Sequence, residues 1–190
     1  MRATTLNPSL SLGDRYGQLT VVVVTLAALL LGWGLKTGVQ GRTADFSADE
    51  ITARVPAGWR NTASEGQLLR AANPLDPTTV YGIETLPAYE DDLANAATTL
   101  SLRRGQKLLA YRVLEQTPVT VNDRSGYKVS YVYVDSEPTL TMDHLPVVMR
   151  GADYFFDAGG RVVVVTLMAA KDGFDQELPA FWRFLSSISY

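Results

Sequence analysis

The sequence contains no cysteine and a single histidine. Without cysteine, the chain has no disulfide bond, no cysteine-ligated zinc or iron–sulfur site and no cysteine nucleophile. A single histidine excludes a metal site built from several histidines. Charge is also scarce, because charged residues make up 19% of the 190 residues and the net charge is −3. The pI near 5.2 argues against nucleic acid as a main partner. We therefore expect one ordinary folded domain with a short appendage.

Near its N-terminus the sequence has a long apolar segment. No charged residue occurs from Tyr16 to Leu35. A helix of about 20 residues spans about 30 Å, which is the thickness of a bilayer core. The sequence therefore predicts a single-pass transmembrane helix over residues 18–36, with Tyr16 and Trp33 as anchors at the level of the lipid headgroups. The lipid bilayer is thus an expected partner.

Two small residues within this segment, Ala28 and Gly32, are spaced so that another helix could pack closely against them. Such pairs are also common in membrane helices that pack against nothing in particular. The alternative to an anchor is a cleavable signal peptide, but only a weak cleavage site follows, at residues 39–41. Two basic residues lie on each flank of the apolar segment, so charge does not decide the orientation.

The patterns in the rest of the chain predict an α+β domain. After the tail (residues 1–17) and the membrane helix, residues 37–45 form a polar linker, and residues 46–190 are enough for one compact soluble domain. Hydrophobic periodicity and turn residues predict strands at 51–55, 68–72, 79–86, 111–115, 119–121, 127–134, 147–156 and 161–169. They predict helices at 91–109 and 175–188. We expect a mainly antiparallel sheet flanked by these helices, as in an α/β/α sandwich.

Two strands have distinctive patterns. Residues 161–169 are apolar on both faces, so this strand should lie in the middle of the sheet, after a hairpin turn at residues 157–160. In the predicted strand at residues 127–134, Tyr127, Tyr131 and Tyr133 share one face. We expect them to pack in the interior, although a solvent-facing series would indicate an interface.

Several local patterns follow one another in an order known from one protein family. They are ARVPAGW at residues 53–59 and the segments 111–114, 119–121, 127–133, 162–170 and 181–188. Over about residues 46–190 the chain resembles the PsbP-like family, whose fold is shared by the extrinsic photosystem II subunit and a Ran-binding nuclear import factor. The fold hosts unrelated roles, so the resemblance implies a non-enzymatic binding or assembly module. Bacterial relatives are often exported and membrane-anchored, which implies a cytoplasmic N-terminus and an extracytoplasmic domain. The uncleaved anchor departs from the photosystem subunit, so no photosystem II role is implied.

Residues with catalytic potential are few. His144 follows Asp143, but adjacent residues usually point apart, so we expect a surface histidine rather than a catalytic dyad. The sequence has no G-x-S-x-G elbow, no phosphate-binding loop and no dinucleotide-binding glycine pattern. It therefore predicts no catalytic, cofactor-binding or metal-ligating residue and no cofactor.

Two charged clusters belong to the first predicted helix. Residues 90–92 are acidic and should cap its N-terminus, although oxygen ligands could also bind a divalent cation. Near its C-terminus, Arg103, Arg104 and Lys107 suit the negative end of the helix dipole. The alternative for these three is a surface that binds an anionic partner.

These features favour a non-catalytic accessory subunit of a larger membrane protein complex, photosynthetic or respiratory. Its helix would lie beside larger subunits, and its domain would dock on their exposed surface and stabilise them. The alternative is a free-standing, membrane-anchored extracytoplasmic binding protein for a small molecule, a lipid or an exported protein. A third possibility, an enzyme, would depend on His144 or on a pair of carboxylates in a cleft.

Overall fold

The structure of the chain is a computed structural model. It describes residues 20–32, 42–87, 92–135 and 146–190. The chain divides into two units, residues 1–42 and residues 43–190, which we describe separately.

Residues 20–32 of the first unit form a helix whose side chains are exposed. In the described part of the chain, no helix has both the length and the apolar character needed to cross a membrane. Ala28 and Gly32 lie on this helix, four residues apart, whereas Tyr16 and Trp33 lie outside the described residues. The transmembrane helix over residues 18–36 therefore stays a prediction.

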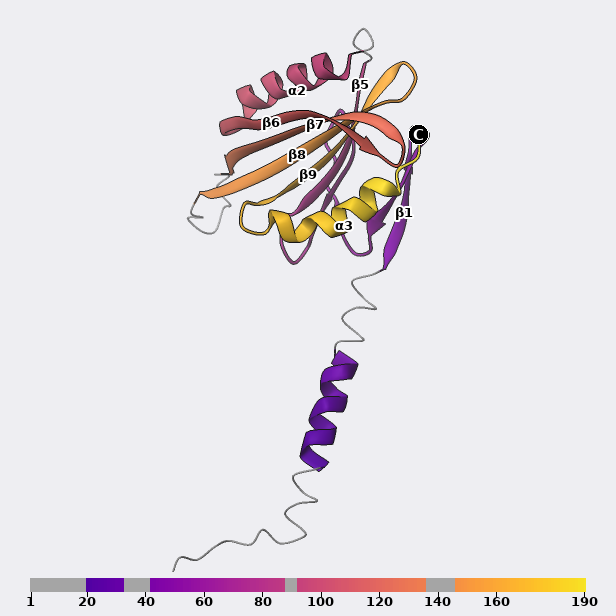
Figure 1. Ribbon diagram of the computed structural model, residues 1–190, viewed down its shortest axis with the longest axis vertical. Coiled ribbons are helices and arrows are strands. Elements are labelled where there is room, and N and C mark those ends of the chain that lie inside the picture. The colour runs from indigo at the N-terminus through magenta and orange to yellow at the C-terminus, as the bar shows by residue number, and fades with distance from the viewer. Residues whose placement is uncertain (1–19, 33–41, 88–91, 136–145) are drawn as a thin grey trace, which may run out of the picture. The chain divides into compact units, whose positions relative to one another are not determined.

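A large antiparallel sheet dominates the second unit. Among the described residues it has seven strands, in the order β3-β4-β5-β9-β8-β7-β6 (Figure 1). The strands are β3 (Arg60–Asn61), β4 (Gln67–Ala72), β5 (Val80–Pro87), β6 (Leu109–Val121), β7 (Arg124–Asp135), β8 (Val147–Asp157) and β9 (Arg161–Ala170). A separate hairpin pairs β1 (Thr43–Ala48) with β2 (Ile51–Pro56).

Two helices cover opposite faces of the sheet (Figure 1). They are α2 (Leu93–Lys107) and α3 (Phe174–Ser186). On the α3 face, aromatic and aliphatic side chains of the sheet pack against α3 and β2 in one core cluster. On the other face, a second cluster joins α2 to β5, β7, β8 and β9. The predicted α+β class, an antiparallel sheet flanked by helices, is confirmed.

The strand β9 lies between β5 and β8, as its sequence predicts. Val163 and Val165 belong to the α3-side core, whereas Val162 and Val164 belong to the α2-side core. Burial on both faces explains why apolar and polar residues do not alternate along this strand. The turn before it places two successive glycines at positive φ, 65° and 100°, a conformation that glycine adopts without steric cost.

Local predictions differ from the structure at two places. β1 begins at Thr43, so the last residues assigned to the linker (37–45) belong to a strand. Residues 111–115 and 119–121 are parts of one continuous strand, β6, which includes Pro118. Among the described residues β6 has a neighbouring strand on one side only, and an edge strand tolerates a proline that cannot donate a ladder hydrogen bond.

Candidate functional site

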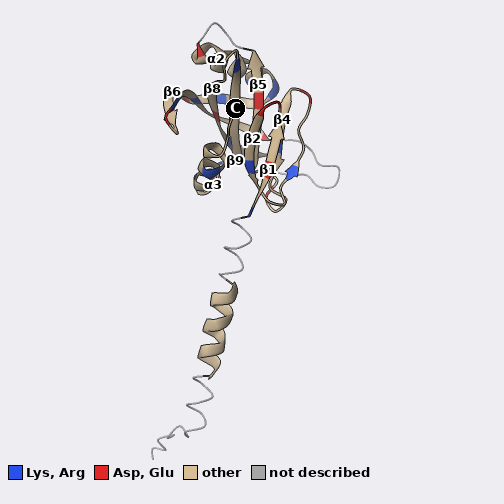
Figure 2. Cartoon of the chain, turned by 90° about the vertical axis from the view of Figure 1, so that its right-hand side faces the viewer, with Lys and Arg blue, Asp and Glu red and all other residues tan. Residues whose placement is uncertain are grey.

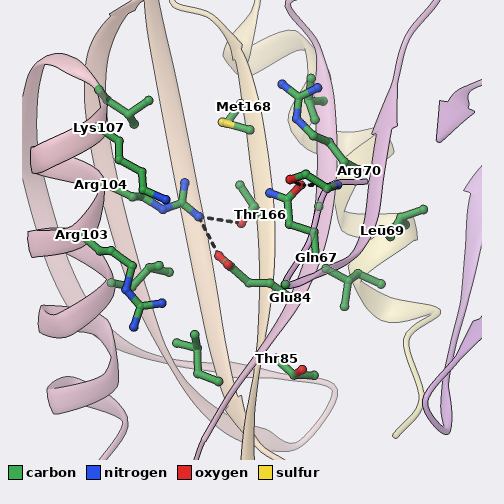
Figure 3. Close-up of a pocket in the computed structure, with 18 of the residues that line it drawn as sticks. Gln67, Leu69, Arg70, Glu84, Thr85, Arg103, Arg104, Lys107, Thr166 and Met168 are labelled. Atoms are coloured by element: carbon green, nitrogen blue, oxygen red, sulfur yellow. Dashed lines mark hydrogen bonds and ion pairs between the residues drawn. The ribbon is translucent and has the colours of Figure 1, made fainter. Parts of the chain in front are cut away.

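The helix α2 leaves part of its sheet face uncovered. It packs mainly on β6, β7 and β8. Beside it, β4, β5 and β9 form the floor and far wall of a cleft with a volume of about 520 Å³ (Figure 3). Small-molecule sites commonly have volumes of about 300–1,000 Å³. The cleft is therefore the candidate functional site of this domain.

The walls of the cleft come from two elements. On one side, Leu100, Arg103, Arg104 and Lys107 line it from α2. Their spacing of three and four residues places them on one flank of the helix. The other side consists of the turn before β4 and of β4 itself, and Gly82, Glu84, Thr166 and Met168 lie between the two sides. Apolar side chains also line the cleft, among them Leu86, Leu100 and Met168, so its lining is mixed.

The cleft is lined by nearly equal numbers of basic and acidic residues. Both signs of charge are spread over the strands and helices of the unit (Figure 2). The cations that line the cleft are Arg70, Arg103, Arg104 and Lys107, and the carboxylates are Glu65, Glu84 and Asp135. Three of the four cations lie on the α2 wall, whereas the carboxylates lie on the turn before β4, on β5 and on β7, so positive charge is concentrated on one side of the cleft.

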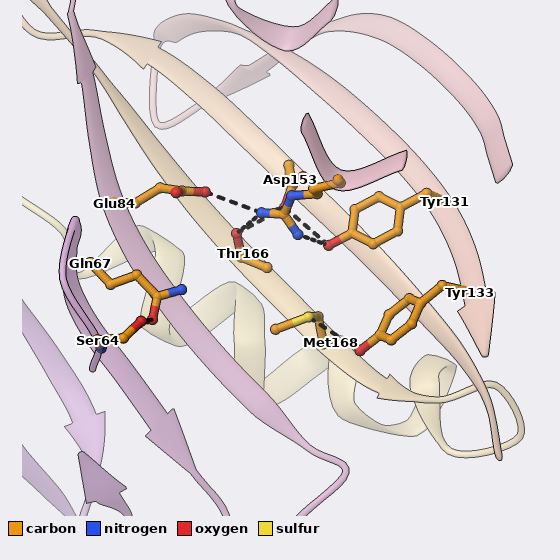
Figure 4. Close-up of polar contacts among 9 residues, drawn as sticks. Ser64, Gln67, Glu84, Tyr131, Tyr133, Asp153, Thr166 and Met168 are labelled. Atoms are coloured by element: carbon orange, nitrogen blue, oxygen red, sulfur yellow. Dashed lines mark hydrogen bonds and ion pairs between the residues drawn. The ribbon is translucent and has the colours of Figure 1, made fainter. Parts of the chain in front are cut away.

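Arg104 is the centre of a polar network beneath the cleft (Figure 4). Its Nη2 lies 3.0 Å from Oδ1 of Asp153 and 3.2 Å from Oε1 of Glu84. The same nitrogen donates to Oγ1 of Thr166 at 3.2 Å, and Nη1 donates to the hydroxyl of Tyr131. Thr166 in turn donates to Oδ1 of Asp153 at 2.8 Å. One guanidinium thus connects α2 to four strands of the sheet, β5, β7, β8 and β9.

The sheet register brings these polar groups together. Asp153 of β8 and Thr166 of β9 are direct cross-strand partners, and Thr166 is opposite Gly82 of β5. Asp153 is only 2% exposed and Thr166 only 4%. Buried polar groups are costly unless they are hydrogen-bonded, and each of these has a partner in the network.

Burial dominates the ionisation of the network. It raises the pKa of Asp153 to about 6, although the neighbouring Arg104 guanidinium opposes this shift. Burial would lower the pKa of Arg104, but Asp153, Tyr131 and Glu84 together raise it above its ordinary value. Burial also raises the pKa of Tyr131. At neutral pH the network therefore contains a charged arginine, an ionised Asp153 and a neutral tyrosine.

Gly151 makes room for Tyr131. A Cβ at Gly151 would collide with the ring of Tyr131, so the ring lies directly against the backbone of β8. This position lets the hydroxyl of Tyr131 reach Asp153 at 3.4 Å as well as Arg104. The next tyrosine, Tyr133, donates to Sδ of Met168 at 3.4 Å at the edge of the cleft.

The structure places several of the residues that the sequence singled out. The side chain of Asp92 caps α2 by accepting from the backbone N–H of Ala94 at 2.8 Å, as predicted for the acidic cluster. Tyr131 and Tyr133 are buried in the α2-side core, also as predicted. Residues 90 and 91 of the cluster and His144 lie outside the described residues. Within the residues described, no cluster of three or more histidine, aspartate or glutamate residues could hold a metal ion.

The sequence interpretation of Arg104 was incomplete. Arg104 does lie in the last turn of α2, where a cation suits the helix dipole. It is nevertheless largely buried, with a side chain 14% exposed, and its main partners are on the sheet. The spacing offered a signal, because Arg104 lies four residues after Leu100 and four before Leu108 on the apolar stripe. Asp153 and Thr166, polar residues within mostly apolar strands, were missed as well.

No protein-family model matches the chain, and no curated protein matches it significantly. Solved structures share its fold. The solution structure of cyanobacterial PsbP (CyanoP) from Synechocystis sp. PCC 6803 has a TM-score of 0.54 at 15% identity, over 77% of this chain and 91% of that chain. A crystal structure from Bacteroides thetaiotaomicron has a TM-score of 0.51 at 12% identity, over 79% and 48% of the chains. The Ran-binding protein Mog1p of Saccharomyces cerevisiae has a TM-score of 0.49 at 10% identity, over 78% and 95%. The domain therefore has the PsbP-like fold.

Proposed function

We propose that this protein is a non-catalytic, membrane-anchored accessory subunit. Its PsbP-like domain docks on a larger membrane protein complex, of photosynthetic or respiratory electron transport, and stabilises it. The observation that carries the proposal is the combination, in one chain, of the 20-residue uncharged segment from Tyr16 to Leu35 with a domain of this fold. The segment has the length and apolar character of an anchor, and the fold is one that serves binding in unrelated settings.

The decisive experiment identifies what the chain binds in its native membrane. The full chain, tagged at its C-terminus, would be solubilised in mild detergent, purified, and analysed by native gel and mass spectrometry. A discrete large assembly of fixed stoichiometry is the expected result, and its other subunits would define the function. A lone species of 20.7 kDa, in detergent that preserves other complexes, would contradict the subunit proposal.

The anchor has its own test. Substituting Leu26→Lys together with Leu30→Lys puts two charges into the apolar segment, where each is costly in a bilayer. We expect alkaline carbonate to extract this variant from membranes but not the wild type. The control is Leu75→Lys with Leu102→Lys, which adds the same charges at exposed leucines of the domain. Extraction of the wild type would contradict anchoring.

We further propose a cytoplasmic N-terminus and an extracytoplasmic domain. Because the chain has no cysteine, a single introduced cysteine reports its own location without background. In intact cells, a membrane-impermeant maleimide should label Asp172→Cys, at an exposed position of the domain, and should not label Ser9→Cys. Labelling in the reverse pattern would overturn this orientation.

The cleft favours a second candidate, a free-standing anchored binding protein. Its volume of about 520 Å³ is sufficient for a small ligand. Stoichiometric co-purification with larger membrane subunits separates the two candidates, because only an accessory subunit requires it.

A further inference from the structure

We propose that the cleft between α2 and β4 binds a small hydroxylated molecule that carries one oxyanion, a phosphate or a carboxylate. This inference goes beyond docking, and it does not depend on how the chain is anchored. It rests on the charges of the α2 wall, on a fixed acceptor and donor opposite them, and on the space that a glycine leaves between.

The α2 wall offers two available cations. Arg103 and Lys107 are four residues apart on the flank that lines the cleft, and both are exposed (Figure 3). Within the described residues, neither forms an ion pair, in contrast to Arg104. Arginine and lysine side chains at this spacing can bind one oxyanion together through charge-assisted hydrogen bonds.

Helix-dipole stabilisation accounts for only part of this arrangement. It explains why cations are favourable near the C-terminus of α2, on any side of the helix. It does not explain why Arg103 and Lys107 both lie on the flank of the helix that lines a cleft. A ligand anion in the cleft accounts both for the positive charge of these residues and for the flank of α2 on which they lie.

The floor of the cleft suits hydroxyl groups. Glu84 uses Oε1 to bind Arg104, and among the described residues no partner engages Oε2. Its cross-strand neighbour is Gln67, whose Oε1 accepts from Ser64 while its amide nitrogen points away from Ser64 (Figure 4). A ligand hydroxyl can donate to the carboxylate and accept from the amide. The negative charge of Glu84 also disfavours a second anionic group here, so the ligand oxyanion belongs at the α2 wall.

Gly82 keeps the floor open. A Cβ at this position would lie 3.4 Å from Cβ of Thr166, in ordinary contact, so the fold itself does not require a glycine here. Its backbone φ is not in the left-handed region either. The missing side chain instead leaves space beside Glu84 and Thr166. Together with the polar side chains around it, Gln67, Glu84 and Thr166, this space suits a compact hydrophilic ligand and not an acyl chain.

Isothermal titration calorimetry on the full chain in neutral detergent tests the proposal, with glucose 6-phosphate, glucose and inorganic phosphate as probes. Glucose 6-phosphate should bind saturably and more tightly than either fragment. Arg103→Gln with Lys107→Gln should weaken binding by at least about tenfold, and Gly82→Val should weaken it by filling the floor. The charge-matched control, Arg112→Gln with Lys171→Gln at exposed positions outside the cleft, should bind as the wild type does. Thermal unfolding of each variant checks that it is folded.

The same titration, repeated with the chain in lipid nanodiscs, distinguishes a lipid headgroup from a free soluble molecule as the natural ligand. If phosphatidylinositol in the nanodisc weakens the binding of glucose 6-phosphate, relative to phosphatidylcholine alone, the natural ligand is a lipid headgroup. Unchanged affinity assigns the site to a free soluble molecule. No saturable binding, equal losses in the cleft and control variants, or phosphate alone binding as tightly as the sugar phosphate would each overturn the proposal.

Discussion

Arg104 of α2 and Asp153 of β8 form an ion pair, 3.0 Å from nitrogen to oxygen, at the interface between the helix and the sheet. Asp153 is almost completely buried, and Thr166 and Tyr131 donate to the same carboxylate oxygen. The pair therefore fixes the position of α2 on the sheet, and with it the position of the cleft wall that carries Arg103 and Lys107.

Removing the cation alone should be strongly destabilising. Arg104→Leu leaves the carboxylate of Asp153 buried without its partner, so we expect a loss of about 3–5 kcal/mol in the free energy of unfolding at neutral pH. The double variant Arg104→Leu with Asp153→Asn should recover much of this loss, because no unpaired charge remains. Urea unfolding followed by circular dichroism measures both.

A surface pair provides the control for this prediction. Lys128 and Glu115 are 3.5 Å apart, and the carboxylate side chain is 53% exposed. Lys128→Gln should therefore cost no more than about 1 kcal/mol. A similar loss for Arg104→Leu and Lys128→Gln would show that burial of the Arg104 pair has no energetic consequence.

The raised pKa of Asp153 predicts a pH dependence with a definite sign. Burial raises this pKa from 3.8 to about 6, so the folded state binds the proton more tightly than the unfolded state. The resulting stability is fully present below about pH 4 and is lost as the pH rises through about 6. The stability of the wild type relative to Asp153→Asn should therefore fall by about 3 kcal/mol from acidic to neutral pH. Urea unfolding of both proteins across this range would contradict the prediction if the wild type gained relative stability as the pH rose.

Gly151 should tolerate no side chain. In Gly151→Ala the new Cβ would collide with the ring of Tyr131, so the ring or β8 must move. We expect a loss of about 1–3 kcal/mol in the free energy of unfolding, with a changed near-ultraviolet circular dichroism signal from tyrosine. Gly82→Ala, where the nearest atom is 3.4 Å away, should change stability by less than about 1 kcal/mol. Equal effects at the two glycines would refute the argument from the position of Tyr131.

The N-terminus of α2 depends on Asp92. Replacing it with alanine removes the acceptor for the N–H of Ala94, and we expect a loss of about 1 kcal/mol. Asn95→Ala, at an exposed position of the same helix, should be neutral or slightly stabilising because alanine has the higher helix propensity. Thermal unfolding compares the two, and a loss confined to Asn95→Ala would show that Asp92 does not act as the cap.

Local sequence patterns predicted most of the sheet and both helices of the domain. They failed at β6, which they divided into two short strands, although an edge strand can continue through Pro118. They also missed β1, a short and mostly exposed strand that pairs with β2 alone. Both failures have the same cause, because the neighbours of a strand decide what it tolerates and those neighbours are distant in sequence.

The candidate site was less predictable than the fold. Arg103 and Lys107 were recognised as cations on one helix, with an anionic partner as an open alternative. The cleft beside them was not predicted, because it exists only where α2 leaves β4 and parts of β5 and β9 uncovered. How far a helix covers a sheet depends on its length and docking position, and neither is encoded by periodicity alone.

The sequence by itself determined the α+β class, the central position of β9 and the acidic cap of α2, because each depends on residues adjacent along the chain. The tertiary structure alone decided the partners of Arg104 and the existence of the cleft. Strand register places Asp153 opposite Thr166, and helix docking places Arg104 above both. These contacts join residues up to 62 positions apart, as between Arg104 and Thr166, so only the folded chain brings their charges within hydrogen-bonding distance.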